Sequence, residues 1–327
     1  MRKTLLRLAG VVLLVLSLLS VPQVSCSQSL MTGNGKFEFG VGIGPLIFLG
    51  DLAGQKGKGK PFIKDVNLPL TRLVKGAYAN IYPAEWLGIR LAVNIGTLES
   101  YDSLIADQGS SEVFRKNRNL QFISPLTEAF LALEFYPTVF LEKREGLRGK
   151  LRPYGLIGVG LFHFNPKGQY IETDGSRRWV ALQPLRLEGQ GMAEYPDRQP
   201  YKLTSMEMPL GMGIKYYFRE NKYIGLEVLH RFTATDYMDD VSRTYINAQL
   251  FQKYLPPQQA AMARQLYYRG NLVDHPTRTA PRLNEQRGNP ENNDSYFSAL
   301  LRLGWRLNNP LSAHHRALMQ LRCPRFF

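Results

Sequence analysis

The chain has 327 residues with 41 basic and 27 acidic side chains, so its formal net charge is +14. Mean hydropathy is -0.24, and beyond the amino-terminal segment there is no run of about 20 apolar residues, so we expect no transmembrane helix in the exported protein. Two cysteines, Cys26 and Cys323, are too few for a disulfide framework.

The amino-terminal segment predicts export. Residues 1–7 carry three basic side chains, and residues 8–21 form an apolar run that is too short to span a bilayer comfortably as a helix. We therefore predict a signal peptide over residues 1–27, followed by a short periplasmic segment over 28–35. A lipoprotein-type processing site at Cys26 is the alternative. For an exported chain we expect no nucleic-acid partner.

Eight later segments alternate apolar and polar residues with a period of two, which is the pattern of β-strands. The gaps between them alternate long and short. Bacterial outer-membrane barrels pair short periplasmic turns with long outer loops, and an even strand number returns both termini to the periplasm. We therefore predict an all-β fold, an eight-stranded antiparallel transmembrane up-and-down β-barrel over residues 36–307 in the outer membrane. The predicted strands are 36–49, 71–82, 86–98, 120–136, 151–164, 205–218, 223–233 and 295–307.

The period alone does not say which face meets lipid, because a soluble lipocalin-like barrel would turn its apolar face inward. The charged residues favour the membrane version, since one Arg or Lys that faces lipid near the midplane costs about 2–4 kcal/mol. Six basic and five acidic residues of the polar faces are therefore predicted inside, where they can neutralise each other. This interior network comprises Lys36, Glu38, Arg90, Glu128, Glu134, Glu207, Lys215, Glu227, Arg231, Arg302 and Arg306. The register of segment 151–164, which has apolar residues on both faces, stays open.

Aromatic residues gather beside the short turns and at the end of the last strand. Because amphipathic rings concentrate at the membrane interface, we expect these residues to form a periplasmic girdle. Its predicted members are Tyr82, Trp86, Phe135, Tyr136, Tyr216, Phe218, Tyr223 and Trp305.

The long loops carry further features. Four lysines, Lys56, Lys58, Lys60 and Lys64, crowd the first outer loop, where lipopolysaccharide phosphates would be natural counter-charges. In the last loop, residues 244–255 and 257–269 have helical spacing and are followed by Gly270 as a terminator. This spacing predicts a helical hairpin over the mouth of the barrel.

A basic tail follows the last strand. Residues 308–327 contain no acidic side chain, and we predict that they lie in the periplasm. Arg316, Arg322 and Arg325 are the candidate docking residues of this tail, and a frayed terminus is the alternative.

The sequence contains no credible catalytic set and no cofactor motif. Asp236, Asp239 and Asp240 could hold calcium, but their spacing matches no EF-hand, so a solvated start of the loop is the favoured interpretation. His230 lies in a predicted strand and alternation points it at lipid, yet no serine or carboxylate sits at a matching spacing. We therefore expect no enzyme activity, no metal and no cofactor, with a lipid-modifying barrel enzyme as a less favoured alternative.

Two parts of the chain resemble a known family. FEFGVGIG at residues 37–44, followed by FLGDL at 48–52, looks like the opening strand of the PorG-like outer-membrane barrels of Bacteroidota. TDYMDDVSRTYI at residues 235–246 is similar to the motif that those proteins carry after a late strand. The resemblance implies a component of the type IX secretion and gliding machinery, where such barrels associate with a periplasmic ring of PorK and PorN type proteins. The periplasmic turns and the tail would make that contact.

Together these observations predict a non-enzymatic barrel that anchors or supports a secretion complex. The alternative is a surface-recognition barrel that binds ligands or partners through its loops at 165–204 and 234–294.

Overall fold

The computed structural model describes residues 37–52, 71–84, 86–104, 115–141, 151–219, 221–273 and 280–307. The signal peptide, the segment 28–35, Lys36, the four lysines of the first outer loop and the basic tail with Arg316, Arg322 and Arg325 lie outside the described residues.

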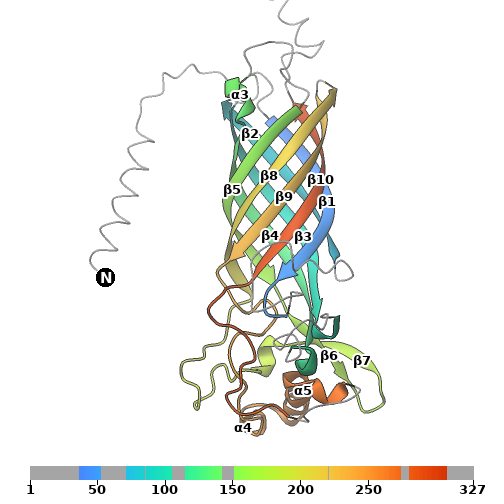
Figure 1. Ribbon diagram of the computed structural model, residues 1–327, viewed down its shortest axis with the longest axis vertical. Helices are drawn as coiled ribbons and strands as arrows, with labels where there is room; N and C mark the ends of the chain where they lie inside the picture. Colours follow the sequence, from blue (N-terminus) through green and yellow to red (C-terminus); the bar gives the residue numbers. More distant parts are fainter. Residues whose placement is uncertain are drawn as a thin grey trace, which may run out of the picture.

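Eight long strands of the described chain close into an antiparallel barrel (Figure 1). Each strand pairs with the next, and the first pairs with the last, which removes the free edges that lipid could not satisfy with hydrogen bonds. The eight-stranded barrel is therefore confirmed, with each strand end within three residues of its prediction. The strands are β1 (Phe37–Leu49), β2 (Arg72–Ala84), β3 (Leu87–Tyr101), β4 (Gln121–Phe135), β5 (Leu151–Phe164), β8 (Thr204–Arg219), β9 (Lys222–Thr233) and β10 (Ser295–Leu307).

Alternation along each strand separates an aliphatic outer wall from a polar interior. In β4, for example, Leu131 and Leu133 are exposed on the outer wall, whereas Glu134 is buried inside. The open register of β5 is now assigned: Tyr154, Leu156 and Phe162 point inward, whereas Ile157 and Val159 point outward.

The predicted aromatic girdle is wrong in three members. Tyr82, Tyr136 and Tyr223 point into the barrel, because alternation places them on the same face as the interior carboxylates and their hydroxyl groups form hydrogen bonds there. The remaining members face outward at the end with the short turns, hereafter the short-turn end: Trp86, Phe135, Tyr216, Phe218 and Trp305.

The seam between β1 and β10 requires a glycine. A Cβ atom on Gly44 would lie 1.8 Å from the carbonyl oxygen of Ala299 in β10, so any side chain would push the two strands apart. At Gly42, by contrast, a Cβ atom would meet its nearest neighbour at 3.5 Å, an ordinary van der Waals distance.

At the opposite, long-loop end, the connections fold into a cap beyond the barrel (Figure 1). The cap comprises the described residues of 165–203 and 234–294. Its elements are the hairpin β6 (Lys167–Ile171) and β7 (Arg177–Ala181), the helices α4 (Leu250–Tyr254) and α5 (Pro257–Tyr267), and the 3₁₀ turns η5 (Gln183–Leu185) and η6 (Gly270–Leu272). Another turn, η3 (Asp102–Leu104), follows β3, and a short helix, α3 (Thr138–Leu141), lies at the short-turn end. No helix of the described chain is long and apolar enough to cross a membrane.

The predicted helical hairpin is too long in its first arm. Helix α4 begins at Leu250 instead of residue 244, because the backbone of Tyr245 forms hydrogen bonds with Asn284 and Glu285 of the loop before β10. Residues 257–267 are helical as predicted, and α5 ends before the extended Tyr268. The β6–β7 hairpin was missed, although its Asp174-Gly175 turn is a recognisable hairpin signal.

Candidate functional site

The barrel interior holds ten of the eleven predicted network residues, and Lys36 lies outside the described chain. In the layer at the short-turn end, Lys215 donates from Nζ to Glu38 (2.9 Å) and to Glu134 (3.3 Å). Arg306 donates to the other oxygen of Glu38 at 2.7 Å. Strands far apart in the sequence therefore meet through one carboxylate.

In the middle layer, Glu227 is shared by two arginines. Arg90 and Arg302 both pair with this carboxylate, and Tyr154 donates its hydroxyl hydrogen to it. Arg90 also pairs with Glu134, which links the middle layer to the layer at the short-turn end. All of these side chains are almost completely buried, so each charge depends on its partner for stabilisation.

The layer nearest the cap is built on Glu128. Arg231 donates to Glu128 at 2.7 Å, and the Tyr296 hydroxyl lies within hydrogen-bond distance of both Glu128 and Glu207. Glu207 pairs with no base in the described chain, and its Oε1 atom has no hydrogen-bond partner there.

The ten described network residues are five acids and five bases, so together they carry no formal net charge. Hydroxyl and amide side chains complete the network. Tyr78, Asn80, Tyr82, Asn94, Tyr136, Tyr154, Tyr217, Tyr223, Tyr296 and Ser298 all point inward. On β3, β4, β8, β9 and β10 the parity of the strand could have found them, because each lies an even number of residues from a charged network residue of the same strand. β2 and β5 carry no network charge, so only their pairing with the neighbouring strands assigns Tyr78, Asn80, Tyr82 and Tyr154. Buried side chains fill the barrel, as expected for eight strands.

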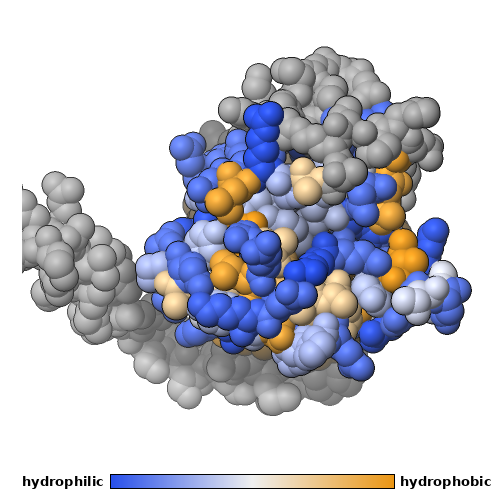
Figure 2. All heavy atoms as spheres, turned by 90° about the horizontal axis from the view of Figure 1, so that it is seen from below, coloured by the Kyte–Doolittle hydropathy of each residue, from blue (hydrophilic) through white to orange (hydrophobic). Residues whose placement is uncertain are grey.

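Ion pairs continue from the barrel mouth into the cap. Arg118 binds Asp102 through two nitrogens at 2.7 and 2.9 Å, and its Nη2 donates to the backbone oxygen of Asp51 at 3.0 Å. Deeper in the cap, Arg287 donates to Glu188 at 2.9 Å, and both side chains are buried. The cap is therefore a packed unit joined to the barrel, and its outer surface is mostly hydrophilic with separate hydrophobic patches (Figure 2).

Four aspartates from three parts of the chain lie together where the cap joins the barrel: Asp51 after β1, Asp236 and Asp239 after β9, and Asp294 before β10. Backbone amides donate to three of them, including that of Leu52 to Asp239 at 3.0 Å. One oxygen of Asp236 and one of Asp294 have no hydrogen-bond partner in the described chain. The prediction of a solvated loop start is wrong, because packing against the first loop and β10 buries Asp236 and Asp239, and Asp240 is buried as well.

Burial and mutual repulsion favour the protonated form of these acids. Burial raises the pKa of Asp236 to about 8, with a contribution from Asp51. Burial likewise raises the pKa of Asp240 to about 7, although Arg287 opposes the shift. Because the folded state holds these protons more tightly than the unfolded state, the stabilisation is lost as pH rises from the ordinary value of 3.8 through about 8. No group of three acidic, His or Cys side chains in the described chain is arranged to hold a metal ion.

His230 occupies an outward position on β9, between the inward-facing Leu229 and Arg231. Its ring packs against that of Phe232 with centroids 4.3 Å apart. The side chain is thus part of the outer wall of the barrel.

Comparisons with known proteins add outer-membrane barrels as structural neighbours. No protein-family model matches the chain, and no curated protein matches it. Ail of Yersinia pestis, solved with the heparin analogue sucrose octasulfate, is similar over 83% of this chain and 99% of its own, with 9% identity and a TM-score of 0.32. OprG of Pseudomonas aeruginosa matches over 84% and 98%, with 10% identity and a TM-score of 0.33. A major outer membrane protein of Thermus thermophilus matches over 83% and 99%, with 11% identity and a TM-score of 0.34.

Proposed function

We propose that this protein is a non-enzymatic, non-conducting scaffold of the outer membrane that anchors a protein complex. The filled interior carries this proposal. Its five acids and five bases are held in ion pairs and hydrogen bonds that run through all three layers, so a continuous water path would have to break several buried pairs. Such a barrel is suited to anchoring the other proteins of a complex.

Conductance measurement tests this role. We expect purified protein inserted into a planar bilayer to give no steady ion current at moderate voltage. A stable current from the wild-type protein would refute the scaffold role. Incubation with phospholipid and lipid A, followed by mass spectrometry, should leave both lipids unchanged, and a modified lipid would instead favour the barrel enzyme.

The proposed orientation places the cap outside the cell and both termini in the periplasm, on the basis of the short and long connections. Ser176, at the exposed turn of the β6–β7 hairpin, offers a labelling position. A Ser176→Cys variant should react with a membrane-impermeant maleimide on intact cells, whereas the wild-type chain, with its two native cysteines, should not. Labelling of Ser176→Cys only after cell lysis would reverse the orientation.

The finer proposal is membership of a type IX secretion complex, with lipopolysaccharide around the barrel and PorK and PorN type proteins as periplasmic partners. The two segments that resemble PorG-like barrels support it, because they contact each other at the barrel mouth: the amide of Leu52 donates to Asp239. The two segments thereby share a structural role in joining barrel to cap.

Pull-down in mild detergent tests this membership and the role of the tail. We expect ring proteins to co-purify with the full chain and to be lost when residues 308–327 are removed. Equal recovery from both forms would eliminate the tail as the docking segment. If the full-length sample contains no ring proteins but other proteins co-purify through the cap, the result would favour the surface-recognition barrel.

A further inference from the structure

The outer wall of the barrel has a furrow along β2. The outward side chains of β2 include Ala77 and Ala79, which contribute only methyl groups. Their cross-strand neighbours are larger: Ala77 lies between Val41 of β1 and Val93 of β3. The surface is therefore lower at these two alanines of β2 than along both adjacent strands.

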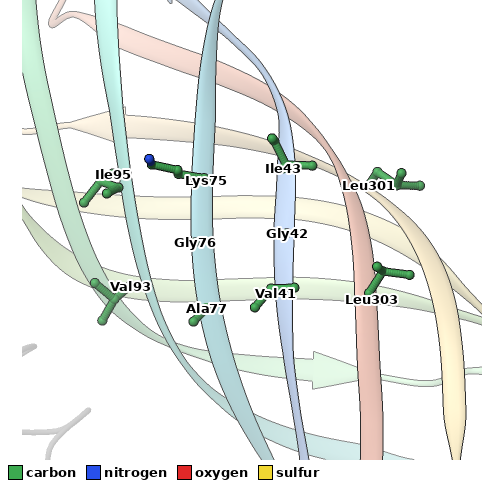
Figure 3. A pocket seen from close by; sticks show the side chains of 10 residues that line it. All are labelled: Val41, Gly42, Ile43, Lys75, Gly76, Ala77, Val93, Ile95, Leu301 and Leu303. Carbon is green, nitrogen blue, oxygen red and sulfur yellow. The ribbon is translucent and has the colours of Figure 1, made fainter.

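A pocket of about 530 Å³ with almost entirely apolar walls lies in this β2 furrow. Figure 3 shows the aliphatic side chains that line the pocket, together with Lys75 on β2. The lining contains no aromatic residue, so flexible hydrocarbon chains fit it better than flat rings. Its side-chain walls are Val41, Ile43, Ala77, Val93, Ile95, Leu301 and Leu303.

Lys75 is the charged residue of the furrow. Its side chain faces outward between Ile43 and Ile95, and within the described chain its ammonium group has no hydrogen bond or ion pair. The nearby outer-wall acid Glu99 is already paired with Arg72. The ammonium group therefore has no anionic partner in the described protein.

The position of Lys75 matches that of a lipid headgroup. It lies three residues from Arg72 at the long-loop end of β2 and nine residues from Ala84 at the short-turn end. At about 3.3 Å per residue and a tilt near 45°, Lys75 is roughly 20 Å from the short-turn end, close to the far edge of an apolar band about 25 Å tall. Its flexible stem can extend to the headgroup region while the furrow runs back into the membrane.

We propose that the β2 furrow is a lipid-binding site, in which an anionic, phosphate-bearing lipid of the leaflet at the long-loop end places one acyl chain along Ala77 and Ala79 and its phosphate on Lys75. The charge of Lys75 selects the anionic headgroup, and the aliphatic walls hold the chain. A second copy of the barrel would leave the ammonium group without a counter-charge.

Native mass spectrometry of the full chain from phosphatidylcholine nanodiscs doped with phosphatidylglycerol tests the site. We expect the wild type to retain one phosphatidylglycerol, and Lys75→Gln to retain it about fivefold less, the effect of one basic side chain at an anionic surface. Lys202→Gln, which removes an exposed charge in the cap, is the matched control and should behave as wild type. Ala77→Leu, which fills the furrow and keeps the charge, should also reduce retention.

Four outcomes would overturn the proposal. Undiminished lipid retention by Lys75→Gln would contradict the headgroup contact. An equal loss of retention in Lys202→Gln would show a general effect of net charge. Undiminished retention by Ala77→Leu removes the acyl-chain seat. Dimers in the nanodisc that disappear in Ala77→Leu would assign the furrow to a second copy. Heat-modifiable mobility on gels, checked for every variant, establishes that each barrel is folded.

Discussion

Replacing Glu227 by glutamine should destabilise the barrel strongly. Arg90 and Arg302 both pair with this buried carboxylate, and Arg302 has no other acidic partner in the described chain. Glutamine keeps the shape of the side chain but removes the charge, and its amide group turns a donor toward one of the two guanidinium groups. The substitution therefore leaves a buried cation without an anion.

The expected magnitude follows from that loss. Removing one partner of a buried ion pair costs about 3–5 kcal/mol, which is a large part of a folding free energy of roughly 5–15 kcal/mol. Arg90 keeps Glu134 as a partner, so most of the cost falls on Arg302. Adding Arg302→Met to Glu227→Gln should therefore recover more than half of the loss, because an apolar side chain of similar length then occupies that space.

Urea unfolding of the protein in lipid vesicles, followed by tryptophan emission, measures these differences. With an m-value of about 2 kcal/mol/M, a loss of 3–5 kcal/mol lowers the midpoint by roughly 2 M. Glu207→Gln is the matched control, because Glu207 pairs with no base in the described chain and should cost at most about 1 kcal/mol. Equal effects of Glu227→Gln and Glu207→Gln, or no recovery in the double variant, would refute the reasoning.

Three further predictions concern the cap and the barrel seam. Raising the pH from about 5 to about 9 should open the cap, since buried acids such as Asp236 lose stabilising protons. Backbone hydrogen exchange in the cap should therefore become faster, and Asp236→Asn should make the exchange rate less pH-dependent. Gly44→Ala should destabilise the barrel by several times the cost of Gly42→Ala, because only the first adds a Cβ atom against the backbone of β10; equal urea midpoints would contradict this. Arg287→Met should make the cap sensitive to protease while the barrel stays folded, whereas Arg243→Met, at an exposed ion pair, should change the cleavage rate little.

The barrel strands could be predicted from the sequence, and so could the direction of the side chains on the strands that carry interior charges. A strand turns successive side chains to opposite faces, so a single choice of face assigns every residue of that strand. The cost of placing Arg90, Lys215 or Arg302 in lipid makes that choice. The three misassigned girdle tyrosines show the limit of the argument, since a ring beside a turn suits either face and only the parity of its strand assigns it.

Only the tertiary structure decided which charges pair and how the cap is built. Lys215 meets Glu38 across 177 positions of sequence because closure of the barrel brings β8 and β1 across the interior from each other. The burial of Asp236 and Asp239 likewise requires the first loop and the start of β10 to pack against them. Alternation is a local property of each strand, whereas the partner of a buried charge depends on contacts that form only when distant segments fold together.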